Sequence, residues 1–144
     1  MKKLMIVLWS LYMLAASSAS ATEFQVTVSN IDVARGGQII VFVFGEEGFP
    51  KAHEQALVRL VDDQLKPTMN FSFSVEMDEI AVKVLHDENK DGKVTKNWTG
   101  IYPAEGLGFS NDQTIGLTGP PKYRNARVSN VQFRKGLNIT IQYP

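Results

Sequence analysis

The chain has 144 residues, no cysteine, and balanced charge, with 15 Lys and Arg residues against 15 Asp and Glu residues. This length suits one ordinary domain, and the lack of cysteine excludes disulfides, zinc–thiolate sites and thiol chemistry. The nearest approach to a basic cluster is Lys122, Arg124 and Arg127. We interpret it as a solvated loop and strand edge, so no nucleic-acid partner is expected.

The N-terminal residues predict a secretory signal peptide. Two lysines precede an apolar run over residues 4–16, and Ala19-Ser20-Ala21 places small residues where cleavage is determined. The run is shorter than the about 20 apolar residues of a membrane-spanning helix, and no cysteine follows it for lipid attachment. We therefore expect cleavage after Ala21, a single mature domain over residues 22–144 without a transmembrane segment, and a periplasmic or secreted location.

Hydrophobic periodicity predicts strands in the first half of the domain. Residues 24–28 alternate between apolar and polar, which indicates one buried face. The run over residues 39–44 is apolar throughout and predicts a central strand covered on both faces. Alternation over residues 71–77 and again over residues 80–84 predicts two strands paired as an antiparallel hairpin.

The segment between these strands follows a different spacing. Apolar residues recur at helical intervals between Pro50, which suits the first turn of a helix, and Pro67, which ends the pattern. This predicts an amphipathic helix, or two helical turns, over residues 51–65. His53 lies four residues before Leu57, and we expect it to be a partly exposed helix residue rather than a ligand.

The C-terminal part of the chain predicts further short strands. Residues 114–117 form a short candidate strand, and the apolar pattern over residues 126–133 changes phase, which indicates a bulge or a turn. Residues 137–143 alternate as a final strand. With about seven short strands and one short helix near residues 51–65, the chain is expected to form a mostly β, antiparallel β-sandwich.

A loop rich in oxygen ligands follows the strand over residues 80–84. Asp87, Asn89 and Asp91 stand at alternate positions before Gly92, the pattern of the first half of an EF-hand calcium loop. The main-chain carbonyl of Lys93 would be the next ligand. These residues predict a calcium site of low affinity, with a dissociation constant on the order of 10⁻⁴ to 10⁻³ M.

The calcium motif is incomplete, and an alternative stays open. Trp98 stands where a bidentate glutamate is expected. Glu105, Asp112 or Glu88 would complete the ligand shell only if the fold returns one of them to the loop. Asp, Asn and Gly are also the residues of ordinary exposed turns, because they tolerate left-handed backbone angles and bond to their own backbone.

Four more residues near the loop are candidate ligand contacts. His86 shares the parity of the core-facing residues, so it is either a buried imidazole bonded to backbone or a base or metal ligand beside Asp87. Trp98, Tyr102 and Phe109 either stack on a ligand such as a sugar or hold the long loop against the edge of the sandwich.

Three loop segments together resemble a known family. They are His86-Asp87-Glu88-Asn89 with Gly92, the segment from Pro103 to Asn111, and the segment from Pro120 to Ala126. Over nearly the whole mature chain the sequence is similar to an uncharacterised bacterial family, domain of unknown function 2141. The resemblance implies an exported protein without an established activity.

The chain departs from the family pattern at two places. Asp78-Glu79-Ile80 stands where a glycine and an aromatic residue are usual, and Thr95 stands where an aspartate is frequent. The second departure removes one candidate calcium ligand. A hairpin that leads into an Asp-x-Asn-x-Asp-Gly loop is also similar, more distantly, to prealbumin-like and immunoglobulin-like sandwiches.

Three functions remain open from the sequence. We expect first an exported, non-catalytic module of the cell envelope that recognises a protein or glycan through loops 87–112, with calcium making those loops rigid. The alternative is a metal-dependent hydrolase that uses His86 with Asp87 or Glu105. The third is a structural envelope protein without a small ligand.

Overall fold

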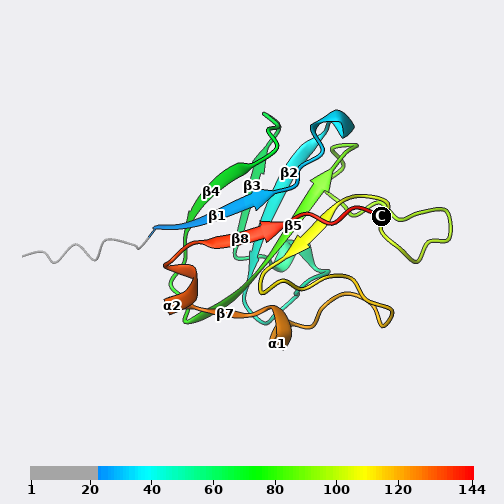
Figure 1. The fold of residues 1–144 in the computed structure, drawn as a ribbon. Coiled ribbons are helices and arrows are strands. Elements are labelled where there is room, and N and C mark those ends of the chain that lie inside the picture. Colours follow the sequence, from blue (N-terminus) through cyan, green and yellow to red (C-terminus); the bar gives the residue numbers. More distant parts are fainter. Residues whose placement is uncertain (1–22) are drawn as a thin grey trace, which may run out of the picture.

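The computed structural model describes residues 23–144, which form two packed β-sheets (Figure 1). One sheet has the strand order β4 (Met69–Ser74), β1 (Glu23–Ser29), β8 (Leu137–Thr140). The other has the order β3 (Val58–Asp62), β2 (Gln38–Phe44), β5 (Glu79–Asp87), β6 (Leu107–Phe109), with β7 (Val128–Ser129) beside the start of β5. The predicted mostly β sandwich is therefore confirmed.

The predicted signal peptide, residues 1–21, lies outside the described residues. Within residues 23–144, no helix has the length and apolar character that crossing a membrane requires.

The strand pairing differs from the sequence prediction in two respects. The hairpin predicted over residues 71–84 is wrong, because β4 pairs with β1 whereas β5 pairs with β2 and β6. The sandwich is also not antiparallel throughout, since β8 lies parallel to β1. Alternation along a strand shows which face is buried, but it carries no information about the partner strand.

The helix predicted over residues 51–65 is wrong over most of its length. Only His53–Gln55 form a single 3₁₀ turn, η2, and β3 follows as an edge strand paired with β2. Val58 and Leu60 still pack against the core, but from alternate positions of a strand. A segment of five residues is too short to distinguish helical from strand periodicity, because both patterns place apolar residues on one face. Pairing with the open edge of β2 therefore decides that this segment is a strand.

Short helical segments occupy the connections. They are η1 (Val33–Arg35), α1 (Tyr123–Ala126) and α2 (Asn130–Phe133). The predicted phase change near residue 129 marks the start of α2, where Ser129 and Gln132 form a reciprocal capping box. The strand predicted over residues 114–117 is reduced to one bridge between Gly116 and Gly119.

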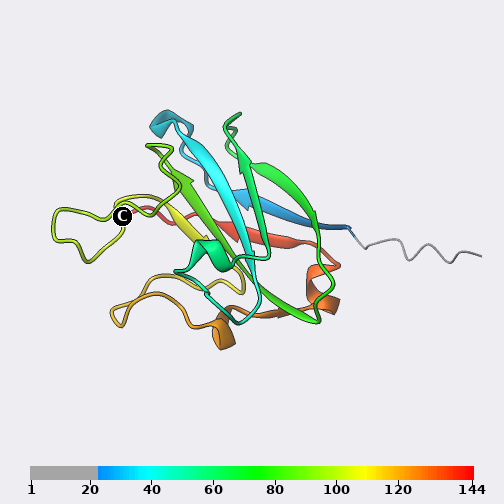
Figure 2. The same cartoon turned by 180° about the vertical axis from the view of Figure 1, so that it is seen from behind.

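The second sheet has hydrophobic clusters on both faces. On β2, Ile39, Val41 and Val43 lie in the core between the sheets, whereas Phe42 and Phe44 belong to a cluster on the outer face. Loop residues cover this outer face (Figure 2); they include Phe49, Ala56, Val94 and Ile115. The prediction that residues 39–44 are buried on both sides is thus confirmed, and the covering loops create the space for a pocket.

Candidate functional site

The acidic loop begins at Asp87, which is fully buried at the end of β5. Its Oδ1 accepts a hydrogen bond from the amide of Asp91 (3.2 Å). Its Oδ2 accepts hydrogen bonds from the amide of Gly92 (2.8 Å) and from Nε2 of Gln38 (2.9 Å). Asp87 therefore ties the loop to the neighbouring strand β2.

The other two side chains that were predicted to bind calcium also bond within the loop. Oδ1 of Asn89 accepts from the amide of Asp91 (3.3 Å), and Oδ1 of Asp91 accepts from the amide of Lys93 (2.8 Å). Within residues 23–144, no three His, Cys, Asp or Glu side chains gather into a group that could hold a metal ion. The loop is ordered by its own hydrogen bonds, and calcium binding stays a prediction.

The fold does return Glu105 to this loop. Glu105 is buried, and its Oε1 accepts from the amide of Glu88 (3.0 Å) while its Oε2 accepts from the amide of Thr95 (2.9 Å). One carboxylate thus joins the two ends of the segment 88–95, and the loop is held in shape from both sides.

His86 is fully buried at the rim of the sandwich. Its Nε2 bonds to the carbonyl oxygen of Gly36 (2.6 Å), so this nitrogen carries the proton. Its Nδ1 accepts from the hydroxyl of Tyr143 (2.7 Å), which in turn accepts from the amide of Asp32 (2.8 Å). Both ring nitrogens are engaged by groups other than carboxylates, which is the geometry of the buried imidazole bonded to backbone.

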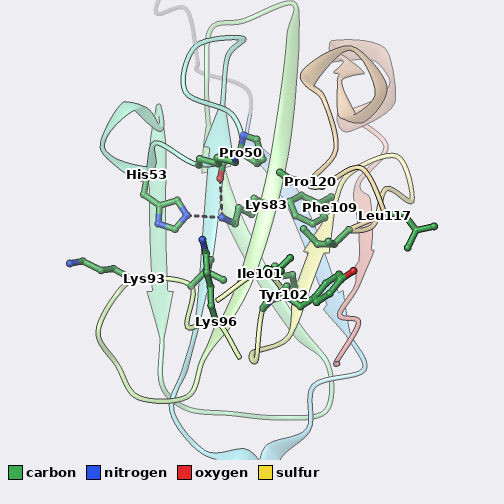
Figure 3. Close-up of a pocket in the computed structure, with 17 residues that line it drawn as sticks. Pro50, His53, Lys83, Lys93, Lys96, Ile101, Tyr102, Phe109, Leu117 and Pro120 are labelled. Carbon is green, nitrogen blue, oxygen red and sulfur yellow. Dashed lines mark hydrogen bonds between the residues drawn. The ribbon is translucent and has the colours of Figure 1, made fainter. Parts of the chain in front are cut away.

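The three aromatic candidates have different surroundings. Trp98 is 96% exposed, while Tyr102 is partly exposed and Phe109 is buried. Tyr102 and Phe109 line a pocket of about 460 Å³ on the outer face of the second sheet, shown in Figure 3. The structure therefore brings two of the three to one cavity, and Trp98 does not line it.

The pocket lies between η2, part of the loop from β5 to β6, and the turn that precedes α1. Its apolar and aromatic lining residues are Pro50, Val94, Ile101, Tyr102, Pro103, Leu107, Phe109, Ile115, Leu117 and Pro120. Four lysines and one histidine also line it: Lys51, Lys83, Lys93, Lys96 and His53.

Lys83 forms part of the pocket floor. In the sheet it pairs with Phe42 of β2 on one side and with Phe109 of β6 on the other. Its side chain is enclosed, leaving the residue 4% exposed, and Nζ donates to the carbonyl oxygen of Pro50 (2.9 Å) and to Nε2 of His53 (2.7 Å). Burial lowers the pKa of Lys83 from 10.5 to about 8.

His53 completes this polar group. Its ring stacks on Phe42 with 4.0 Å between centroids, and its Nδ1 lies 3.3 Å from the carbonyl oxygen of Gly92, to which it donates. Burial, and then the charge of Lys83, lower the pKa of His53 below its usual 6.5. The neutral ring can therefore accept a hydrogen bond from the ammonium group of Lys83.

Sequence reasoning missed both residues of this pair. Simple alternation places Lys83 on a solvent face. His53 is partly exposed in a helical turn, as expected, but it was not expected to contact a ligand. One signal was present: residues 80–85 are apolar except for Lys83, which is the composition of a strand covered on both faces.

Comparison with known proteins yields one finding. Residues 26–135 match a family described as an uncharacterized protein conserved in bacteria (DUF2141). Comparison with curated proteins and with solved structures gives no significant match. Because the match covers more than half of the 144 residues, the chain belongs to this uncharacterized bacterial family.

Proposed function

We propose that the protein is a non-catalytic binding module of the bacterial cell envelope that holds a small ligand in the pocket described above. The observation that carries the proposal is a largely apolar cavity of about 460 Å³ over a rigid sheet. Small-molecule sites commonly have volumes of about 300–1,000 Å³, apolar walls and a few placed polar groups. The predicted signal peptide supports the envelope location.

The pocket lining combines groups fixed in a strand with groups carried by a loop. Leu107 and Phe109 belong to β6, whereas Val94 and Tyr102 belong to the loop that precedes it. The loop is held by the buried carboxylates of Asp87 and Glu105, as described above. A site formed by ordered loops on a sheet loses little conformational entropy when a ligand binds, which supports recognition as its task.

Binding of the neutral apolar fluorophore N-phenyl-1-naphthylamine tests the proposal. The wild-type protein should bind it saturably, with one site per chain. Ile115→Trp places a larger side chain at the half-buried pocket wall and should abolish most of the signal. Ser72→Trp, on an exposed position of β4 in the other sheet, is the matched control and should bind normally.

Two results would contradict this function. One is an absence of saturable binding by the wild-type protein. The other is equal binding by the folded Ile115→Trp variant, which would place the fluorophore elsewhere on the surface.

A further inference from the structure

We infer that the ligand of this pocket carries an oxyanion on an apolar body, and that the oxyanion hydrogen-bonds to Nζ of Lys83. The inference rests on the proposed function and names the chemical class of its ligand. A carboxylate, a phosphate monoester and a sulfonate share this chemistry.

The first argument is the unpaired charge of Lys83. An ammonium group has three N–H donors, and two of them are directed to Pro50 and His53, both of which are neutral acceptors. Among residues 23–144, none of the ion pairs includes Lys83. Buried charges are normally paired, because an uncompensated charge is costly in a low-dielectric environment. An oxyanion in the pocket would accept the third N–H and neutralise the charge.

The second argument is the charge of the pocket lining. Lys51, Lys93 and Lys96 line it together with Lys83, and no Asp or Glu does. The whole chain has equal numbers of basic and acidic residues, so this excess of positive charge is local. In Figure 3, Lys96 extends toward the His53–Lys83 pair. A concave surface with one sign of charge concentrates ligands of the opposite sign.

The third argument is the apolar remainder of the cavity. Phe109 and Leu107 contribute to the floor, and Val94 and Ile115 contribute to the walls. These groups offer an oxyanion no hydrogen bonds, but they would shield an aromatic or aliphatic body from water. A simple inorganic anion would leave this surface unused, so the geometry points to an amphipathic anion.

A hydrogen-bond chain connects the acidic loop to this site. Asp87 accepts from the amide of Gly92, the carbonyl of Gly92 accepts from His53, and His53 accepts from Lys83. His53 is therefore a positioning residue that fixes the direction of the Lys83 ammonium group. The loop that the sequence marked as a candidate metal site also holds one side of the anion site in place.

Two fluorophores with the same apolar body test the inference. They are 8-anilinonaphthalene-1-sulfonate, which carries a sulfonate, and the neutral N-phenyl-1-naphthylamine. Lys83→Met should weaken sulfonate binding about tenfold or more, since a hydrogen bond to a charged group contributes about 1.5–3 kcal/mol. Binding of the neutral probe should change by less than about twofold, because its contacts are apolar. Lys135→Met, at an exposed lysine beside α2, is the control and should change neither affinity.

Competition against the sulfonate probe distinguishes the possible head groups. Decanoate, decyl phosphate and decanol share one chain, and the two anions should displace the probe at lower concentration than decanol. The stronger of the two competitors identifies the preferred head group. Equal competition by all three would overturn the inference.

Other outcomes are equally decisive. If the neutral probe binds but Lys83→Met leaves sulfonate binding unchanged, this inference fails while the proposed function survives. If neither probe binds, the proposed function fails as well.

If Lys83→Met does not fold, the double variant Lys93→Met/Lys96→Met at exposed positions replaces it. It should weaken only the sulfonate, and more strongly at low salt; equal loss of both probes would overturn the inference.

Discussion

Lys83 pairs in the sheet with Phe42 on one side and Phe109 on the other, and its ammonium group contacts a carbonyl oxygen and an imidazole rather than a carboxylate. A pKa lowered from 10.5 to about 8 means that the charged form is disfavoured in the folded protein. The difference corresponds to about 3 kcal/mol of lost stability at pH values below the folded pKa. Proteins retain such groups most often at functional sites.

This cost predicts how stability depends on pH. Between about pH 8 and pH 10.5 the unfolded chain holds the Lys83 proton more tightly than the folded protein, so the free energy of unfolding should rise with pH. Lys83→Met should lack this rise. Urea unfolding at pH 7.5 and pH 9.5 measures the difference between the two proteins. Staying below pH 10 limits the opposing effect of Tyr123 and Tyr143, whose pKa values burial raises. Parallel pH profiles for both proteins would contradict the prediction.

Asp87 is the residue on which the acidic loop depends most. Asp87→Asn should reduce the free energy of unfolding by about 3 kcal/mol, because the amide group would place a donor against other donors in a buried site. Asp63→Asn is the matched control at an exposed ion pair with Lys90, and its effect should stay below about 1 kcal/mol. Chemical denaturation measures both values, and equal losses would show that the buried hydrogen bonds contribute little.

At the scale of elements, β6 joins the two sheets. Its Leu107 exchanges backbone hydrogen bonds with Gln142, which follows β8 (3.0 and 2.8 Å). The glycine in this strand has a packing reason: a Cβ atom at Gly108 would lie 2.6 Å from Cγ2 of Ile139 and 3.0 Å from the carbonyl oxygen of Thr140. A side chain there would push β6 away from β8.

Alanine substitutions test this close approach. Gly108→Ala should reduce the free energy of unfolding by about 1–3 kcal/mol through overpacking against β8. Gly116→Ala should be neutral or slightly stabilising, because a Cβ atom there meets nothing within 4 Å and restricts the unfolded chain. Thermal melts of the two variants compare them directly. Similar melting temperatures would mean that the sheets adjust without cost.

The acidic loop as an element carries the remaining calcium prediction. Calcium would have to share the oxygens of Asp87, Asn89 and Asp91 with the amide groups that now occupy them. Thermal melts in millimolar calcium and in EDTA test the sequence prediction. A higher melting temperature in calcium that disappears in Asp91→Ala would confirm it, and equal melting temperatures would exclude it.

At the scale of the whole molecule, the envelope location is the main prediction. Expressed with residues 1–21 included, the protein should appear in the periplasmic fraction or the medium. Its measured mass should correspond to a chain that begins at Thr22, because the small residues Ala19 and Ala21 predict cleavage after Ala21. Intact-mass spectrometry of the fractions checks this, and an uncleaved chain in the cytoplasm would contradict it.

The tertiary structure corrected the sequence predictions that depend on which strands pair with each other. Strands β4 and β5 were identified by alternation, yet they lie in different sheets, and residues 58–62 form an edge strand instead of part of a helix. Local periodicity reports burial of one face, which depends only on the residues of the segment. Pairing depends on hydrogen bonds between segments distant in the chain, and these are not encoded in any local pattern.

The same distinction applies to the candidate site: some of its features follow from local sequence, and others follow only from the fold. The sequence alone indicated the β-rich fold, the family and the acidic loop around Asp87, because composition, alternation and turn residues are local properties. Only the tertiary structure brought His53, Lys83 and Phe109 together, from a 3₁₀ turn and two strands, under loops that cover the sheet. The physical reason is that burial of the outer face depends on where distant loops fold, and that burial turns an ordinary lysine into an unpaired buried cation beside a pocket.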